Sequence, residues 1–139
     1  MVDTNGPRDW ILCDKAFSLH KYAPFSFEVD KLARVRRGDV VLLRSPSNPN
    51  AQAVKRVVAL PGDRVRTPRA KTASCRLPTG RVWVESDNAG VGRDSNAYGA
   101  VPLGLVQGKV VCVVWPPSRW GAVPSQHDDS RITRYSRTR

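Results

Sequence analysis

The chain has 139 residues, of which 40% are hydrophobic and 25% are charged, enough apolar material for one core and too little for a second. No stretch approaches the roughly 20 apolar residues that a membrane-spanning helix needs, and Gly and Pro follow no collagen-like period. The 23 Lys and Arg against 12 Asp and Glu give a net charge of +11, which favours anionic partners such as nucleic acid or an anionic membrane surface.

Short apolar runs bounded by turn residues predict strands along most of the chain. In chain order, these runs cover residues 10–13, 40–43, 53–60, 81–85 and 108–115. Turns are predicted at Arg36-Arg37-Gly38-Asp39 and Pro61-Gly62-Asp63, because glycine permits a positive φ and proline presets φ. Residues 31–37 are the only place where a short helix is expected.

The strand pattern predicts an all-β domain, a folded sheet or barrel with long loops, over residues 9–122. A flexible N-terminus is expected at residues 1–8. A disordered basic tail is expected at residues 123–139, because Ile132 and Tyr135 are its only large apolar residues and cannot offset the entropy of ordering it.

Cysteine and histidine indicate neither a disulfide framework nor a metal site. Cys13, Cys75 and Cys112 have no Cys-x-x-Cys spacing, and the two histidines lie far apart in the sequence. We therefore expect no metal and no cofactor. The basic stretch at residues 64–81, six cations without an acid, fits either a solvated loop or a contact with anionic lipid or nucleic acid.

The strand at residues 53–60 carries one cation on each face. Alternation places Lys55 in one row of small and apolar side chains and Arg56 in the other. Desolvation disfavours an ammonium ion, so a lysine held in such a row could act as a general base for a hydroxyl nucleophile. A lysine at a strand end that reaches water with its amine is the alternative.

Two polar clusters follow the strand at residues 81–85. Ser86-Asp87-Asn88 and Asp94-Ser95-Asn96 predict a structured loop, because Asx and Ser side chains bond to nearby backbone. The two aspartates could also bind a cation, but their spacing matches no calcium loop.

The order of these segments resembles the type I signal peptidase family. Arg37-Gly38-Asp39, Lys55-Arg56-Val57 through Pro61-Gly62-Asp63, and Asp87-Asn88 with Asp94-Ser95 are similar to that family's motifs. Val82-Trp83-Val84-Glu85, Asp94-Ser95-Asn96 and the Trp-Pro-Pro segment at residues 115–117 resemble the branch of the mitochondrial inner membrane proteases. The resemblance covers about residues 9–121.

This resemblance implies a Ser/Lys endopeptidase that removes sorting presequences from proteins delivered to the intermembrane space. Lys55 would be the general base. Presequence-bearing proteins would be the substrates, the other inner membrane protease subunit a partner, and the intermembrane-space side of the inner membrane the location. The supporting residues of the catalytic loop would be Arg56, Asp87, Asn88, Asp94, Ser95 and Asn96.

Two departures from the family accompany the resemblance. The family's nucleophile lies in a Ser-Met-x-Pro segment after a membrane anchor, and these residues contain no such segment; Ser18 and Ser26 are not followed by Met. The chain is therefore expected to carry the β domain without the nucleophile. Gly92 stands where the family usually has a serine that bonds the lysine, and Ser86 stands where it usually has glycine. Losing the hydroxyl at position 92 is expected to remove one hydrogen bond from the lysine, worth about 1 kcal/mol.

Three other functions remain open. The domain could be a non-catalytic subunit that holds a partner protease. It could bind nucleic acid, although Trp83 is the only strand aromatic near cations and its valine neighbours suggest burial. A self-cleaving repressor-type Ser/Lys protease lacks support, because no helix-turn-helix segment is present.

Trp115 and Trp120 fit either packing against the end of the sheet or anchoring at a membrane interface.

Overall fold

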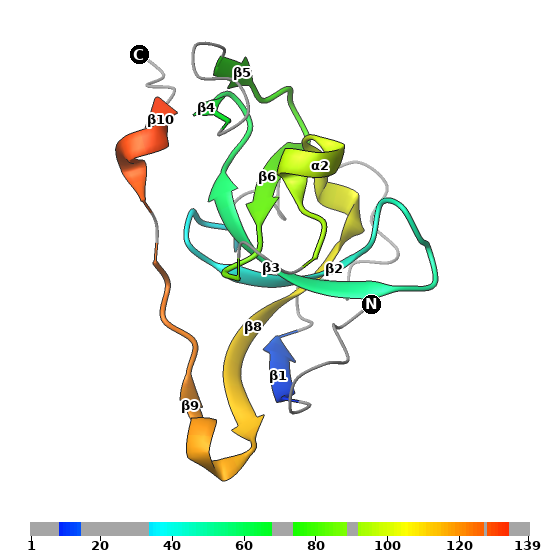
Figure 1. The fold of residues 1–139 in the computed structure, drawn as a ribbon, viewed down its shortest axis with the longest axis vertical. Helices are drawn as coiled ribbons and strands as arrows, with labels where there is room; N and C mark the ends of the chain where they lie inside the picture. Colours follow the sequence, from blue (N-terminus) through cyan, green and yellow to red (C-terminus); the bar gives the residue numbers. More distant parts are fainter. Residues whose placement is uncertain (1–8, 15–33, 68–73, 89–91, 127, 134–139) are drawn as a thin grey trace.

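The computed structural model describes residues 9–14, 34–67, 74–88, 92–126 and 128–133, and strands dominate it (Figure 1). The short helix α2 (Ser95–Tyr98) and the 3-10 turns η1 (Leu103–Leu105), η2 (Pro117–Arg119) and η3 (Asp129–Arg131) accompany the strands. The strands are β1 (Trp10–Asp14), β2 (Val40–Arg44), β3 (Gln52–Ala59), β4 (Arg64–Arg66), β5 (Ser74–Arg76), β6 (Arg81–Glu85), β7 (Val101–Pro102), β8 (Val106–Trp115), β9 (Gly121–Ala122) and β10 (Ile132–Thr133).

The strands form two antiparallel sheets. The larger sheet has the order β1-β8-β2-β3-β6-β7, with β9 paired to the far end of β8, and the smaller has the order β10-β4-β5. Neither sheet closes into a barrel within the described residues, so the folded-sheet form of the all-β prediction is confirmed. In Figure 1 the long strand β8 carries β1 and β9 away from the body of the domain.

Each predicted strand is present, with ends that differ from the prediction by at most two residues. Arg34, inside the predicted range 31–37, is helical, and residues 31–33 lie outside the described residues. The prediction that this range is the only place for a short helix is wrong, because α2 lies at residues 95–98. Asp94 caps α2, its side chain accepting a hydrogen bond from the backbone N–H of Asn96, which is the usual device for starting a helix. Four residues are too few to show a helical period in the sequence.

The core lies in two adjoining clusters. The main cluster packs β2, β3, β6 and β8 together through fully buried aliphatic side chains, among them Val41, Leu43 and Val84. The second cluster, built on Ala59, Val65, Leu77 and Trp83, joins the small sheet to the large one. Because β3 contributes to both clusters, its backbone is held along most of its length.

The two predicted turns are present and bind each other. Arg37 donates two hydrogen bonds to the carboxylate of Asp63, from Nε at 2.8 Å and from Nη2 at 2.6 Å. Asp63 is 1% exposed and also accepts from the backbone N–H of Leu60. This ion pair ties the entry of β2 to the turn after β3, so both ends of the segment that carries Lys55 are fixed.

The prediction of a disordered tail from residue 123 is wrong for residues 123–126 and 128–133, here called the C-terminal strap. Figure 1 shows the strap running from β9 back along the sheet to β10, which pairs with β4. Arg131 forms an ion pair with Glu85 at 2.7 Å, and Ile132 packs on the second core cluster. Backbone pairing and charge hold the strap, and neither appears in a count of its apolar residues. Residues 134–139 lie outside the described residues.

Asp63→Ala is expected to lower the free energy of unfolding by about 3 kcal/mol, because the change leaves the Arg37 guanidinium and a buried N–H without their carboxylate. Urea denaturation followed by circular dichroism measures this loss. Asp9→Ala, which breaks the exposed pair with Arg119, is the control and should cost less than about 1 kcal/mol. Equal losses in the two variants would show that the buried pair contributes no more to the free energy of unfolding than the exposed pair does.

Stability should fall in alkali partly through Tyr98. Burial, together with the charge of Asp94, raises the pKa of Tyr98 to about 12 from the ordinary value of 10.0. Between these values the unfolded chain releases the phenol proton while the folded chain keeps it, so stability declines as pH rises from 10 to 12. Tyr98→Phe should show a shallower decline in urea titrations over this range. Parallel pH profiles for parent and variant would contradict the assignment.

Candidate functional site

Lys55 lies in the middle of β3 with its side chain in an apolar row. It is 8% exposed, it pairs across the sheet with Val41 of β2, and Val57 follows it on the same face; both valines are fully buried. The predicted placement is therefore confirmed, and the alternative of a lysine that reaches water with its amine is wrong. A cation in this row has lost most of its hydration, so its remaining polar contacts decide where the amine points.

The amine of Lys55 donates a hydrogen bond to Oγ of Ser86, at 2.5 Å. Ser86 follows β6 directly, and β6 pairs with β3. The hydroxyl that Gly92 does not offer is supplied by the serine at position 86, so the lysine has a hydroxyl partner. Ser86 is also the site residue that the sequence reasoning missed. Its only signal in the sequence was its place next to Asp87 at the end of a strand.

Arg56 lies on the opposite face of β3 and binds the residue after Ser86. It donates from Nε and Nη2 to the two carboxylate oxygens of Asp87, at 2.7 and 2.6 Å. Its Nη1 donates to the carbonyls of Gly38 and Pro124. The hydrogen bonds that Arg56 donates to Asp87 raise the pKa of Arg56 above its ordinary value. One guanidinium thus joins the loop after β6, the turn before β2 and the C-terminal strap.

Gly38 is required at this junction. Its φ is +86°, and a β-carbon there would meet the backbone oxygen of Gln126 at 2.8 Å. The strap therefore packs directly on the Arg-Gly-Asp turn. Asp39, the last residue of that turn, is 2% exposed and pairs with Lys109 of β8 at 2.9 Å.

Asp94 and Ser95 hold the loop behind the lysine. Oδ2 of Asp94 accepts from the backbone N–H of Ser86 at 3.2 Å, and Oγ of Ser95 accepts from the backbone N–H of Val84 at 3.0 Å. Ser95 is 1% exposed. The structure brings both residues to the site. Asn96 is joined to them through its backbone, whereas Asn88 is exposed on the loop.

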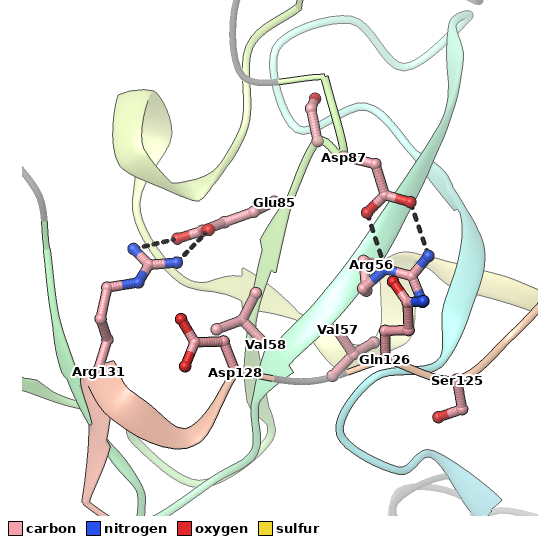
Figure 2. A pocket seen from close by; sticks show the side chains of 10 residues that line it. Arg56, Val57, Val58, Glu85, Asp87, Ser125, Gln126, Asp128 and Arg131 are labelled. Atoms are coloured by element: carbon pink, nitrogen blue, oxygen red, sulfur yellow. Dashed lines mark hydrogen bonds and ion pairs between the residues drawn. The ribbon is translucent and has the colours of Figure 1, made fainter.

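A pocket of about 660 Å³ lies between β3, the end of β6 and the C-terminal strap. Figure 2 shows Arg56 with Asp87 on one side and Arg131 with Glu85 on the other, around Val58. Ser86 also lines this pocket. Its walls are charged and its floor is aliphatic. Within the described ranges, no three His, Cys, Asp or Glu side chains come together as a metal site. Ser18 and Ser26 lie outside those ranges.

The tryptophans divide into one buried and several exposed side chains. Trp83 is 4% exposed, which removes the strand aromatic that a single-strand nucleic-acid interface would need. Trp115 and Trp120 are 53% and 73% exposed, so the packing interpretation is wrong for them. Trp10 and Leu12 are also exposed; they belong to β1, which pairs with the projecting end of β8 and places Trp10 opposite Trp115. This apolar end, here called the tryptophan arm, is available for contact.

Comparison with known proteins identifies the family. The family model for signal peptidase, peptidase S26, matches residues 1–73. The chain is similar to mitochondrial inner membrane protease subunit 2 of Danio rerio, with 45% identity over 98 residues, 70% of this chain and 54% of that protein. It is 40% identical over 115 residues to subunit 2 of Saccharomyces cerevisiae (81% of this chain and 58% of that protein). It is 37% identical over 99 residues to subunit 1 of Homo sapiens (67% and 60%).

The chain spans about half the length of the curated relatives it matches. A crystal structure of a signal peptidase I from Enterococcus faecalis aligns with a TM-score of 0.46 and 20% identity, over 55% of this chain and 96% of that one. The family model covers more than half of the 139 residues, and the motifs around Lys55 are present in the expected order. The chain therefore belongs to the signal peptidase family, peptidase S26.

Proposed function

We propose that this chain is the β domain of a serine endopeptidase that removes sorting presequences from proteins delivered to the mitochondrial intermembrane space. The observation that carries the proposal is Lys55, an amine buried in an apolar row of β3 and hydrogen-bonded to Ser86, in a chain of the signal peptidase family. A desolvated amine of this kind is suited to accept a proton from a hydroxyl.

In the proposed mechanism Lys55 acts as the general base. Its uncharged amine takes the proton of a serine hydroxyl while the serine oxygen attacks the scissile carbonyl. The resulting ammonium then gives that proton to the leaving amine, which departs as the acyl-enzyme forms. Water, deprotonated by the same amine, releases the presequence and regenerates the serine. The nucleophile is proposed to be the serine of the family's Ser-Met-x-Pro segment, a motif that these 139 residues do not contain.

The remaining site residues support the base. Arg56 and Asp87 hold the loop after β6 from one side, and Asp94 and Ser95 hold it from the other. The substrate is proposed to lie extended against a strand edge, with small residues before the cut. Hydrogen-bond donors near the nucleophile would stabilise the oxyanion.

The names of the relatives support a two-subunit assembly at the inner membrane. Both subunit 1 and subunit 2 of the mitochondrial inner membrane protease are similar to this chain, and we propose that it works beside the other subunit on the intermembrane-space side. Within the part of the chain that the structure describes, no helix has the length and hydropathy needed to cross a bilayer. We propose that the tryptophan arm rests on the anionic membrane surface, since indole rings favour the interface.

Lys55→Ala should abolish turnover in a chimera that adds a Ser-Met-x-Pro segment and its membrane anchor from a relative to this chain. Removing the amine removes the base, whereas removing a buried polar group from an apolar row leaves the thermal midpoint nearly unchanged or raises it. Cleavage of a presequence peptide and a melting curve give the two readouts.

Arg66→Ala is the matched control for Lys55→Ala, because it deletes an exposed cation on β4 and should leave cleavage at the parent rate. If Lys55→Ala cleaves as fast as the parent chimera, the assignment of the base is wrong. A parent chimera that folds and cleaves nothing would instead favour the non-catalytic, partner-binding function.

Trp115→Ser with Trp120→Ser should weaken binding to vesicles that contain anionic phospholipid. The expected loss is roughly tenfold or more, since tenfold needs only about 1.4 kcal/mol across two indoles. Cosedimentation with vesicles measures it. Arg66→Ala, on the small sheet that Figure 1 shows at the other end of the molecule, is the control and should change binding little. Unchanged binding in the double tryptophan variant would contradict the proposal that the tryptophan arm contacts the membrane.

A further inference from the structure

We infer that Ser86 is a positioning residue, which orients the Lys55 amine toward the reacting hydroxyl. The inference rests on the proposed function and adds to it the group through which the base is aimed. The Nζ to Oγ distance of 2.5 Å is the direct observation. A lysine side chain has four rotatable bonds, and an apolar row offers its amine no preferred direction, so one hydrogen bond selects one rotamer.

Ser86 can select that rotamer because hydrogen bonds hold its own backbone and the side chain of the next residue in place. The backbone N–H of Ser86 donates to Oδ2 of Asp94, and Asp94 is fixed in turn as the cap of α2. The next residue, Asp87, accepts two hydrogen bonds from Arg56. A hydroxyl on a mobile loop could not define a direction, whereas this loop is bound at consecutive residues.

The two strong contacts of β3 have the same sequence offset. Lys55 binds Ser86 and Arg56 binds Asp87, each 31 residues further along the chain. Adjacent side chains on opposite faces of one strand thus hold adjacent residues of one loop. A shift of the loop by one residue would break both contacts together, so the ion pair at the pocket secures the hydrogen bond in the apolar row.

Ser86 borders the pocket as well as the apolar row. It is half-buried, and the pocket between β3 and the C-terminal strap includes it among its lining residues. Its hydroxyl therefore stands at the boundary between the buried amine and the space open to solvent. From this position the hydroxyl can hydrogen-bond the amine without itself binding the substrate.

The first test measures the mobility of the Lys55 side chain in this chain itself. Relaxation of ¹³Cε in lysine-labelled protein gives an order parameter for the amine end. Ser86→Ala and Ser86→Gly should lower it, and Ser86→Thr, which keeps a hydroxyl, should preserve it. Ser125→Ala removes another hydroxyl from the same pocket and should have no effect. An order parameter that stays at the parent value in Ser86→Ala and Ser86→Gly overturns the inference.

The second test uses the chimera described above. Ser86→Ala should lower kcat about tenfold with KM unchanged, as expected when one hydrogen bond that aims the base is lost, and Ser86→Thr should recover most of the rate. A kcat equal to that of the parent overturns the inference even when Lys55→Ala is inactive. Turnover that survives in Lys55→Ala rejects the proposed function instead, and the relaxation data then still decide whether Ser86 orients the amine.

Discussion

Two neighbouring residues of β3 bind the loop that follows β6, and the candidate site depends on this pair of contacts. Lys55 reaches Ser86 through the apolar row, while Arg56 reaches Asp87 on the solvent side. Neither contact would persist alone with the same geometry. An exposed ion pair is weak in water, and a single hydroxyl on a free loop does not order a lysine. Joined through one peptide unit, they fix both the buried amine and the pocket wall beside it.

Buried carboxylates link the turns and strands that surround these two contacts. Asp63 and Asp39 are almost inaccessible to solvent, and each is matched by a cation from a distant strand or turn and by a backbone N–H. Removing one partner of such a pair costs much more than the pair itself contributes, because the other charge is left without compensation. The excess of basic residues therefore has two roles. Some cations complete the core at its edges, and others, such as those on β4 and β5, remain on the surface.

Local patterns in the sequence were enough for the five longer strands, β1, β2, β3, β6 and β8, whereas the five strands of two or three residues, β4, β5, β7, β9 and β10, were not predicted. Alternation along residues 53–60 placed Lys55 and Arg56 on opposite faces, and glycine and proline placed the turns, because these signals arise within a few residues. The C-terminal strap and α2 were missed for the opposite reason. The strap is held by β4, Glu85 and Arg56, partners far away in the sequence. The helix α2 has four residues and depends on its cap at Asp94.

The sequence by itself determined the family, the order of its motifs along the chain and the place of Lys55 in a row of small and apolar side chains, since each is encoded in a short segment. Only the tertiary structure decided which hydroxyl meets that lysine. Pairing of β3 with β6 sets the register that places position 86 against Nζ, and register is a property of two strands at once. The exposure of the tryptophan arm was decided in the same way, because burial depends on what packs over a side chain and no local pattern states that.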